Sequence, residues 1–91
     1  MSLLIKAQVK EIGDLVQVRR TSKPDMYKIV LTLETSDGQV LFPEIRNNNL
    51  KILEREGINE GDIVEATILF QGSVKGENKY NNILINTIKK V

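Results

Sequence analysis

The sequence predicts an all-β protein: a five-stranded barrel with one short helix between its third and fourth strands. Three patterns in the 91 residues support this expectation. Apolar and polar residues alternate with a period of two along most of the chain, as in strands with one buried face. Between residues 50 and 56 the apolar spacing changes to that of a helix. Glycine, proline and asparagine separate these segments and mark turns.

The first strand is expected from Leu4 to Arg19, with a bend in its middle. The alternation is interrupted at Gly13-Asp14, and a glycine inside a strand pattern usually marks a bulge or a sharp bend. A polar loop over residues 20–25 follows, because Pro24 and its serine and aspartate neighbours favour irregular backbone. One long, bent strand is therefore expected before the loop.

The second and third strands are expected over residues 26–35 and 39–46, joined as a hairpin. The turn residues 36–38 read Ser-Asp-Gly, in which Gly38 is suited to a positive φ. Pro43 lies within the third strand and has no backbone N–H to donate. It therefore predicts a bulge or a sheet edge at that position.

One helix of about two turns is expected from residue 50 to residue 56. Asn47, Asn48 and Asn49 precede it and are candidate N-caps, while Gly57 is suited to the left-handed residue at its end. The remaining chain predicts a fourth strand over 63–71, a flexible polar loop over 72–79 and a fifth strand over 80–90.

The same alternation predicts the core. Phe70 shares a face with apolar strand residues and is expected to be buried. For Phe42 a core position is preferred over an exposed one, but Pro43 leaves the register of this strand open. The other expected core residues are Val9, Val18, Ile29, Leu31, Leu53, Val64, Ile68 and Leu84.

The order β-β-β-α-β-β matches the OB-fold, a five-stranded Greek-key barrel that binds ligands on its second and third strands between two loops. Residues 1–91 are then a single OB-fold domain with one short helix between strands 3 and 4. An SH3-like barrel is the alternative, but it usually lacks a helix at this position.

Composition excludes several classes of function. The chain contains no histidine and no cysteine, which removes the usual catalytic bases and nucleophiles and the thiolate and imidazole metal ligands. Its acidic residues are scattered. We therefore expect no enzyme, no cofactor and no metal ion held by side chains. Apolar runs are far shorter than the ~20 residues of a membrane span, so a cytoplasmic location is expected.

The net charge is +1, from 13 basic and 12 acidic residues. Any binding to a polyanion must therefore depend on local clusters of charge. Basic residues do gather in and beside the two expected loops, and tyrosines flank the same loops. Solubilising surface charge and packing at the barrel rim are the alternative interpretations. The candidate nucleic-acid-binding residues are Arg19, Arg20, Lys23, Tyr27, Lys28, Phe42, Arg46, Lys75, Lys79 and Tyr80.

Two stretches resemble the single-stranded-DNA-binding OB-folds of bacteria and phages. Residues 60–66, Glu-Gly-Asp-Ile-Val-Glu-Ala, resemble their turn into the fourth strand, and Gly72 followed by residues 79–83, Lys-Tyr-Asn-Asn-Ile, resembles their entry into the fifth. The resemblance covers nearly the whole chain in element order and implies binding of single-stranded DNA. Members often carry an aromatic residue and a glycine at the end of strand three. Here Arg46 stands in that region and can stack through its guanidinium plane.

Two functions of different classes follow. The first is binding of single-stranded nucleic acid, DNA or RNA, with low sequence specificity because few groups are placed to read base edges. The second is a protein-interaction or oligomerisation module without nucleic-acid binding. A homo-oligomer is expected in addition, because so small a domain has a marginal core. The first strand, or the edge of the third strand near Pro43, is expected to pair with a second copy.

Overall fold

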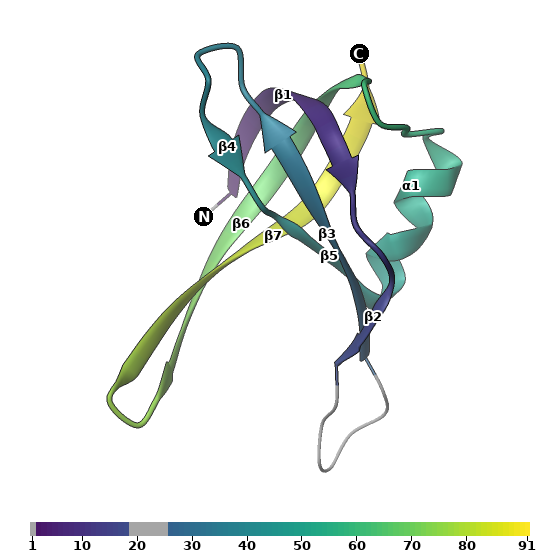
Figure 1. Ribbon diagram of the computed structural model, residues 1–91. Coiled ribbons are helices and arrows are strands. Elements are labelled where there is room, and N and C mark those ends of the chain that lie inside the picture. Colours follow the sequence, from purple (N-terminus) through teal and green to yellow (C-terminus); the bar gives the residue numbers. More distant parts are fainter. Residues whose placement is uncertain (1, 19–25) are drawn as a thin grey trace.

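The computed structural model describes residues 2–18 and 26–91, with backbone only at Ser2, Val18, Asn48, Ser73 and Lys75 (Figure 1). The described residues form strands joined mostly by short turns, with one short helical segment. In chain order the elements are β1 (Ser2–Ile12), β2 (Val16–Val18), β3 (Met26–Glu34), β4 (Val40–Leu41), β5 (Glu44–Arg46), a 3-10 turn η1 (Asn47–Leu50), α1 (Lys51–Arg55), β6 (Ile63–Lys75) and β7 (Asn78–Lys90).

The strands close into a barrel. Sheet neighbours follow the order β1, β6, β7, β5, β3, and β3 pairs back onto β1. Most pairs are antiparallel, but β5 and β7 run parallel and meet at a single register pair, Glu44 opposite Leu84. With β1–β2 as one bent strand and β4–β5 as another, this is the five-stranded all-β OB-fold, and the predicted fold class is confirmed.

Gly13 lies at the bend between β1 and β2, as the interrupted alternation predicted. Its backbone N–H donates to the Val30 carbonyl oxygen at 3.0 Å. A Cβ built at Gly13 would lie 2.7 Å from the same oxygen, closer than side chains come to backbone. The bend therefore brings two backbones together at a point where only glycine fits. A register shift in β1 between Val9 and Glu11 adds to the curvature.

Pro43 interrupts the hydrogen-bonded ladder without shifting it. Leu33 faces Leu41 before the proline and Ile29 faces Ile45 after it, so a single register holds along β4 and β5. The carbonyl oxygen of Pro43 accepts the Leu31 N–H at 2.9 Å, and its ring is fully buried. The predicted bulge is therefore absent here, whereas the alternative prediction, a sheet edge, fits β4, which among the described residues pairs only with β3. Continuous register places Phe42 on the outer face, and the preference for a core position was wrong.

Asn47 and Asn49 do not cap the helix, and the side chain of Asn48 lies outside the description. The helical segment begins after Arg46 without a capping hydrogen bond from a side chain. Asn47 adopts a φ of 45°, and its Oδ1 accepts the Tyr27 backbone N–H at 3.1 Å. Asn49 donates from Nδ2 to the Ile85 carbonyl oxygen at 3.3 Å. The N-cap prediction was wrong at Asn47 and Asn49, because their amides tie the helical segment to β3 and β7 instead.

The end of the helix was predicted correctly. Gly57 takes a φ of 64°, its N–H donates to Glu54, and the Ile58 N–H donates to Leu53. This pair of hydrogen bonds is the Schellman motif, which satisfies carbonyl groups that a helix end would otherwise leave unpaired. Ile58 is buried, and Leu53 packs against the same core. The motif thereby fixes the chain's path from α1 towards β6.

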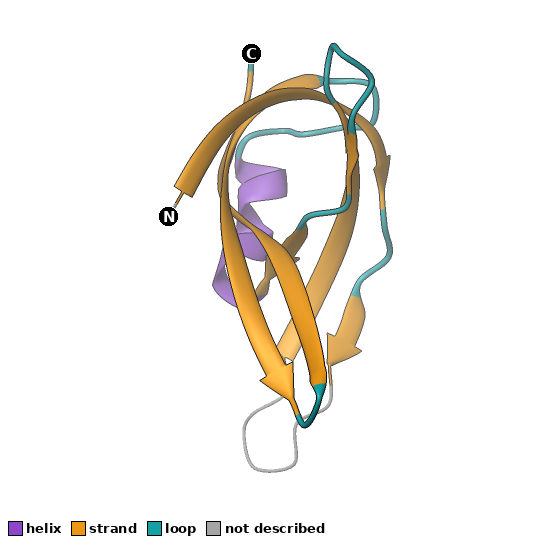
Figure 2. Ribbon diagram, turned by 90° about the vertical axis from the view of Figure 1, so that its left-hand side faces the viewer, coloured by secondary structure: helices purple, strands orange, loops and turns teal. Residues whose placement is uncertain are grey.

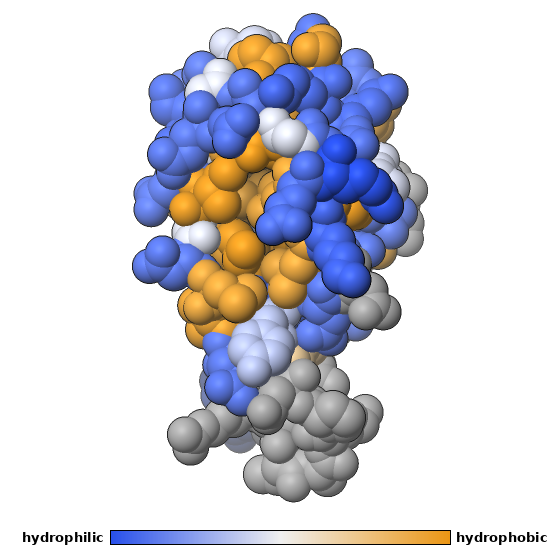
Figure 3. Space-filling view, turned by 90° about the vertical axis from the view of Figure 1, so that its right-hand side faces the viewer, coloured by the Kyte–Doolittle hydropathy of each residue, from blue (hydrophilic) through white to orange (hydrophobic). Residues whose placement is uncertain are grey.

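The core lies inside the barrel and against α1. Predicted burial is confirmed for four residues, whereas Ile29, Leu53 and Leu84 are only half-buried and the side chain of Val18 lies outside the description. On the side of the molecule that carries β2 and α1, an apolar area bordered by hydrophilic side chains stays open to solvent (Figure 3). The buried cluster is Ala7, Val9, Leu31, Leu33, Ile45, Ile52, Ile58, Val64, Ala66, Ile68, Ile85 and Ile88.

The polar segment 72–79 is a hairpin ribbon and not the flexible loop predicted from its composition. Pairing between β6 and β7 continues to Lys75 opposite Asn78, and Gly76, with a φ of 61°, begins a two-residue turn. This ribbon, residues 70–83 and here called the arm, projects from the barrel (Figures 1 and 2). Phe70 lies where the arm leaves the barrel and is 54% exposed. Its predicted burial was wrong, because the face it shares with Ile68 no longer meets the core there.

Candidate nucleic-acid interface

A groove lies beside the junction at which β5 and β7 close the barrel. Among the described residues, β5 and β7 share a single register pair, and β4 pairs only with β3. Backbone edges of β4 and of the arm therefore face each other without hydrogen bonds between them. The space between them has a volume of about 360 Å³. Its lining residues are Val30, Val40, Leu41, Phe42, Glu44, Asn81, Asn82 and Ile83.

The groove combines an exposed aromatic ring with the side-chain amides of two asparagines. Phe42 is 61% exposed on the β4 side. Asn81 and Asn82 line the arm side, and the hydrogen bonds found among the described residues include none from their side-chain amides. A flat aromatic ring opposite unpaired amide groups can accept a planar, polar ligand such as a nucleobase.

None of the four aromatic side chains belongs to the core. Besides Phe42 and Phe70, Tyr27 is 40% exposed at the start of β3 and Tyr80 is 47% exposed on the arm. Aromatic residues normally dominate a small protein's buried area. Here the core consists of aliphatic side chains, and all aromatic rings are available at the surface. The predicted candidates Tyr27, Phe42 and Tyr80 are thus all accessible, and Phe70 adds a fourth that the sequence reasoning had assigned to the core.

Two of the predicted cations are paired with an acid that the sequence reasoning missed. Lys28 and Arg46 lie opposite each other on β3 and β5, and Glu44 lies two residues before Arg46 on the same face. Lys28 Nζ donates to Glu44 Oε1 at 2.5 Å, and Arg46 Nη2 donates to Glu44 Oε2 at 2.7 Å. These three side chains, here called the Glu44 cluster, are 30%, 12% and 26% exposed for Lys28, Glu44 and Arg46.

Electrostatics in the Glu44 cluster keep the acid ionised. Burial tends to raise the pKa of the Glu44 carboxyl, but the hydrogen bonds and charges of Lys28 and Arg46 outweigh it and hold that pKa below its ordinary value. The cluster therefore carries one net positive charge. The buried Nε of Arg46 lacks an acceptor among the described residues, so Glu44 does not satisfy the whole guanidinium group. Because Pro43 leaves the register intact, one face of the strand carries Phe42, Glu44 and Arg46. Glu44 could have been found from the sequence only by assuming this unbroken register.

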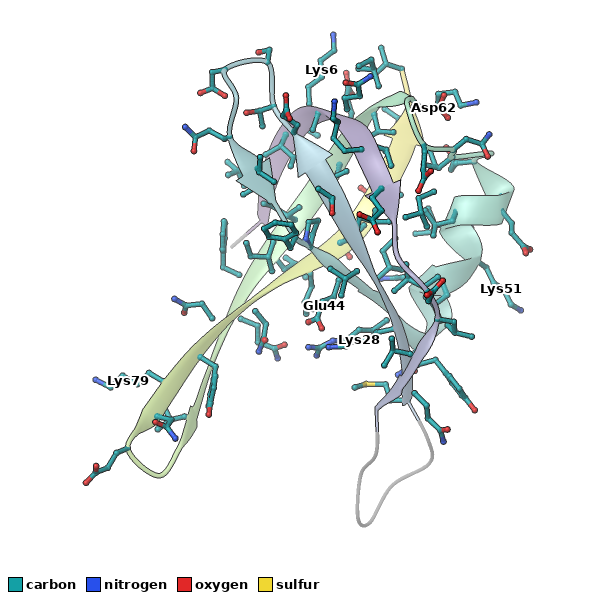
Figure 4. All side chains as sticks on the ribbon, in the orientation of Figure 1. Lys6, Lys28, Glu44, Lys51, Asp62 and Lys79 are labelled. Carbon is teal, nitrogen blue, oxygen red and sulfur yellow. The ribbon has the colours of Figure 1, made fainter. Side chains whose placement is uncertain are left out.

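The other predicted cations are separate from this cluster. Lys79 lies exposed on the arm, and Figure 4 shows it far from Glu44 and Lys28, which point towards each other. The backbone of Lys75 lies in β6 beside the turn, and its side chain is outside the description. Arg19, Arg20 and Lys23 also lie outside the described residues. The structure thus joins Lys28 and Arg46 through Glu44, which lines the groove with Phe42, and places Lys79 and Tyr80 on the arm.

The described part of the chain was compared with the requirements of a metal site and of a membrane-spanning helix. Among residues 2–18 and 26–91, acidic side chains form no group able to hold a metal ion. The described helical segment is too short and too polar to cross a membrane.

Comparisons with known proteins identify the architecture. No family model matches the chain, and no curated protein matches it in sequence. The second OB-fold domain of replication protein A from Methanococcus maripaludis is similar in structure, with a TM-score of 0.70 and 18% identity over 100% of this chain and 84% of that one. The N-terminal domain of PriB from Thermoanaerobacter tencongensis, a dimeric structure, gives a TM-score of 0.53 and 11% identity over 99% and 94%. The chain is therefore an OB-fold protein whose structural neighbours are domains of replication protein A and PriB.

Proposed function

We propose that this protein binds single-stranded nucleic acid, DNA in the first place, with low sequence specificity. The exposure of all four aromatic side chains, from 40% to 61%, carries the proposal. Exposed rings lose the favourable burial that normally places them in a core. Stacking against bases provides a compensating role, since each stacked base contributes about 1–3 kcal/mol. The structural likeness to a domain of replication protein A supports the same function.

The distribution of charge fits contacts with phosphates. The Glu44 cluster supplies one net positive charge at the groove, and Lys79 adds another on the arm. The sequence places Arg19, Arg20 and Lys23 between β2 and β3. A strand crossing from the arm to the start of β3 would pass Lys79, the Glu44 cluster and exposed aromatic rings. Phosphate contacts of this kind make affinity depend on salt and carry no sequence information.

Replacing Phe42 with alanine tests the role of stacking. Binding of a fluorescent oligo-dT should weaken by about 1–3 kcal/mol, because the ring would no longer stack against a base. The slope of log affinity against log salt should stay the same, because no cation is removed. Leu4→Ala is the matched control: Leu4 is also largely exposed, and it lines a different hollow beside α1. Equal affinity of Phe42→Ala and the parent protein would argue against this interface.

We include two further features in the proposal. The protein acts by binding and not as an enzyme, since its sequence lacks histidine and cysteine. It also forms a homo-oligomer through a strand edge, since β4 and β2 each pair only with β3 among the described residues. An unpaired strand edge can pair with another chain. Light scattering at micromolar concentration should give a mass above that of the 10.3 kDa protomer. A single 10 kDa species would contradict the oligomer and leave the binding proposal intact.

A protein-interaction module is the second candidate function. The apolar area beside β2 and α1 favours it, because contiguous exposed apolar surface often marks a protein contact (Figure 3). Salt titration separates the two candidates. Affinity for oligo-dT that falls as salt rises supports the nucleic-acid function. Absence of binding at low salt, from a protein shown to be folded, favours the interaction module.

A further inference from the structure

Glu44 occupies a conspicuous place for an acid in a groove that should receive a polyanion. Among the described residues that line the groove, it is the charged one. Its side chain is only 12% exposed, and it accepts hydrogen bonds from Lys28 and Arg46. Both partners come from the strands that form the groove's floor. A phosphate approaching either cation would therefore meet a carboxylate that is already bound to both.

A role in stability alone explains this arrangement poorly. Removing two or three charges from water carries a desolvation cost that can equal the attraction among them, and well-packed apolar side chains at such positions are often as stabilising. The outer faces of β3 and β5 also carry apolar residues, such as Val30 opposite Glu44, so aliphatic packing is compatible with this position. The consequence specific to an acid here is electrostatic: it cancels one of the two positive charges at the groove.

We propose that Glu44 is a resident anion that competes with nucleic-acid phosphates for Lys28 and Arg46 and so sets the affinity and salt dependence of the groove. The inference rests on the proposed binding of single strands. In the free protein the carboxylate holds both cations. When a strand binds, its phosphates replace the carboxylate on one or both of them. Each binding event is then an exchange of anions, which weakens binding and favours release.

The magnitude follows from counting cations. Each phosphate contact on a single strand contributes about −0.7 to the slope of log affinity against log salt. Neutralising Glu44 makes one to two cations fully available, so the slope should steepen by about 0.7 to 1.4. If the electrostatic contribution vanishes near 1 M salt, affinity at 0.1 M should rise by about 5- to 25-fold by the same relation.

The test compares Glu44→Gln with the matched variant Glu65→Gln. Both replacements raise the net charge by one, and both remove an acid paired with a cation, since Glu65 lies 3.8 Å from Lys89. Glu65 lines the hollow beside α1 and not the groove. Anisotropy titrations of labelled oligo-dT from low to high salt should show tighter binding and a steeper slope for Glu44→Gln only. Equal tightening in both variants would overturn the inference, because net charge alone would explain it.

Weaker binding by folded Glu44→Gln would also overturn it, because Glu44 would then position the two cations for phosphate. If neither the parent nor the variants bind oligo-dT, both this inference and the proposed function fail. If the parent binds and Glu44→Gln binds with the same affinity and slope, only the inference fails. The three results are therefore distinguishable in a single set of titrations.

A measurement on the parent protein tests the same exchange without requiring that any variant folds. Side-chain carboxyl ¹³C signals of glutamates report the surroundings of each carboxylate. On saturation with oligo-dT, the chemical shift of the Glu44 carboxyl should change, because Lys28 and Arg46 leave the carboxylate and bind phosphates. The chemical shift of the Glu65 carboxyl should stay the same. A Glu44 signal that remains fixed while backbone signals of the groove shift would contradict the exchange of anions.

Discussion

Gly13→Ala tests whether the close backbone contact at the barrel's bend is required for the fold. The new Cβ would lie 2.7 Å from the Val30 carbonyl oxygen, a backbone atom that cannot rotate away. The strands must separate, which costs about 1–3 kcal/mol as overpacking does elsewhere. Separation also weakens the 3.0 Å hydrogen bond from Gly13 to Val30, worth about 0.5–1.5 kcal/mol. We therefore expect a loss of about 2–4 kcal/mol in the free energy of unfolding.

Gly72→Ala is the matched control on the arm. A Cβ there would find its nearest neighbours at 3.9 Å, which is ordinary contact. The same substitution should therefore leave the free energy of unfolding unchanged or raise it by up to about 1 kcal/mol, because alanine lowers the conformational entropy of the unfolded chain. Urea unfolding of the parent and both variants measures the difference. Because a domain of this size loses about 4–8 °C in melting temperature per kcal/mol, Gly13→Ala should melt at least about 8 °C lower. A Gly13→Ala protein as stable as Gly72→Ala would refute the account of the bend.

Three further predictions concern stability. Phe70→Ala should lower the free energy of unfolding by less than about 1 kcal/mol because the ring is 54% exposed. Ile45→Ala should lower it by about 2–5 kcal/mol because Ile45 is fully buried, and urea unfolding of the two variants measures the difference. Gly57→Ala should destabilise by about 1 kcal/mol, because a side chain is strained at a φ of 64°, and a fall in melting temperature measures it. The folded-state pKa of Glu44 is depressed, so its stabilising contribution is present above its ordinary value of 4.5 and is lost as pH falls through the folded pKa. Urea unfolding between pH 7 and pH 3 should therefore show a shallower acid loss for Glu44→Gln, and parallel curves would contradict the ion pairing.

Local patterns were sufficient to predict the barrel's main elements. Period-two alternation located the strands, and glycines located the bend at Gly13 and the end of the helix at Gly57. These features depend on backbone geometry that one residue type satisfies, so they can be recognised without knowledge of the tertiary contacts. The OB-fold followed from element order, because few topologies place a helix after three strands of a small barrel.

The errors arose where tertiary context decides the outcome. Composition made residues 72–79 resemble a loop, yet cross-strand pairing around Gly76 extends both strands. Phe70 keeps the alternation of a buried strand although the barrel has already ended there. A side chain is buried only where other elements pack against its face of the strand. The alternation of apolar and polar residues does not reveal where along the strand that packing ends.

The candidate site was only partly predictable for a related reason. Lys28, Arg46 and Phe42 were predicted as candidate binding residues from their types and their places on the expected strands. Glu44 was missed because its role depends on continuous register across Pro43, which a proline in a strand does not usually allow. A sequence reading that treats strand prolines as compatible with unbroken register would place residues 42, 44 and 46 on one outer face.

The affinity of the parent protein for single-stranded oligo-dT as a function of salt tests the proposed binding of nucleic acid most directly. About four to six of the candidate cations are expected to contact phosphates, which predicts a slope of log affinity against log salt of about −3 to −4. A duplex of the same length should bind more weakly, because its bases stack on one another and do not reach the aromatic rings. We expect saturable binding at low salt, with an affinity that falls along this slope as salt rises. Failure of the folded protein to bind oligo-dT at low salt, or an affinity that does not change with salt, would contradict the proposed binding.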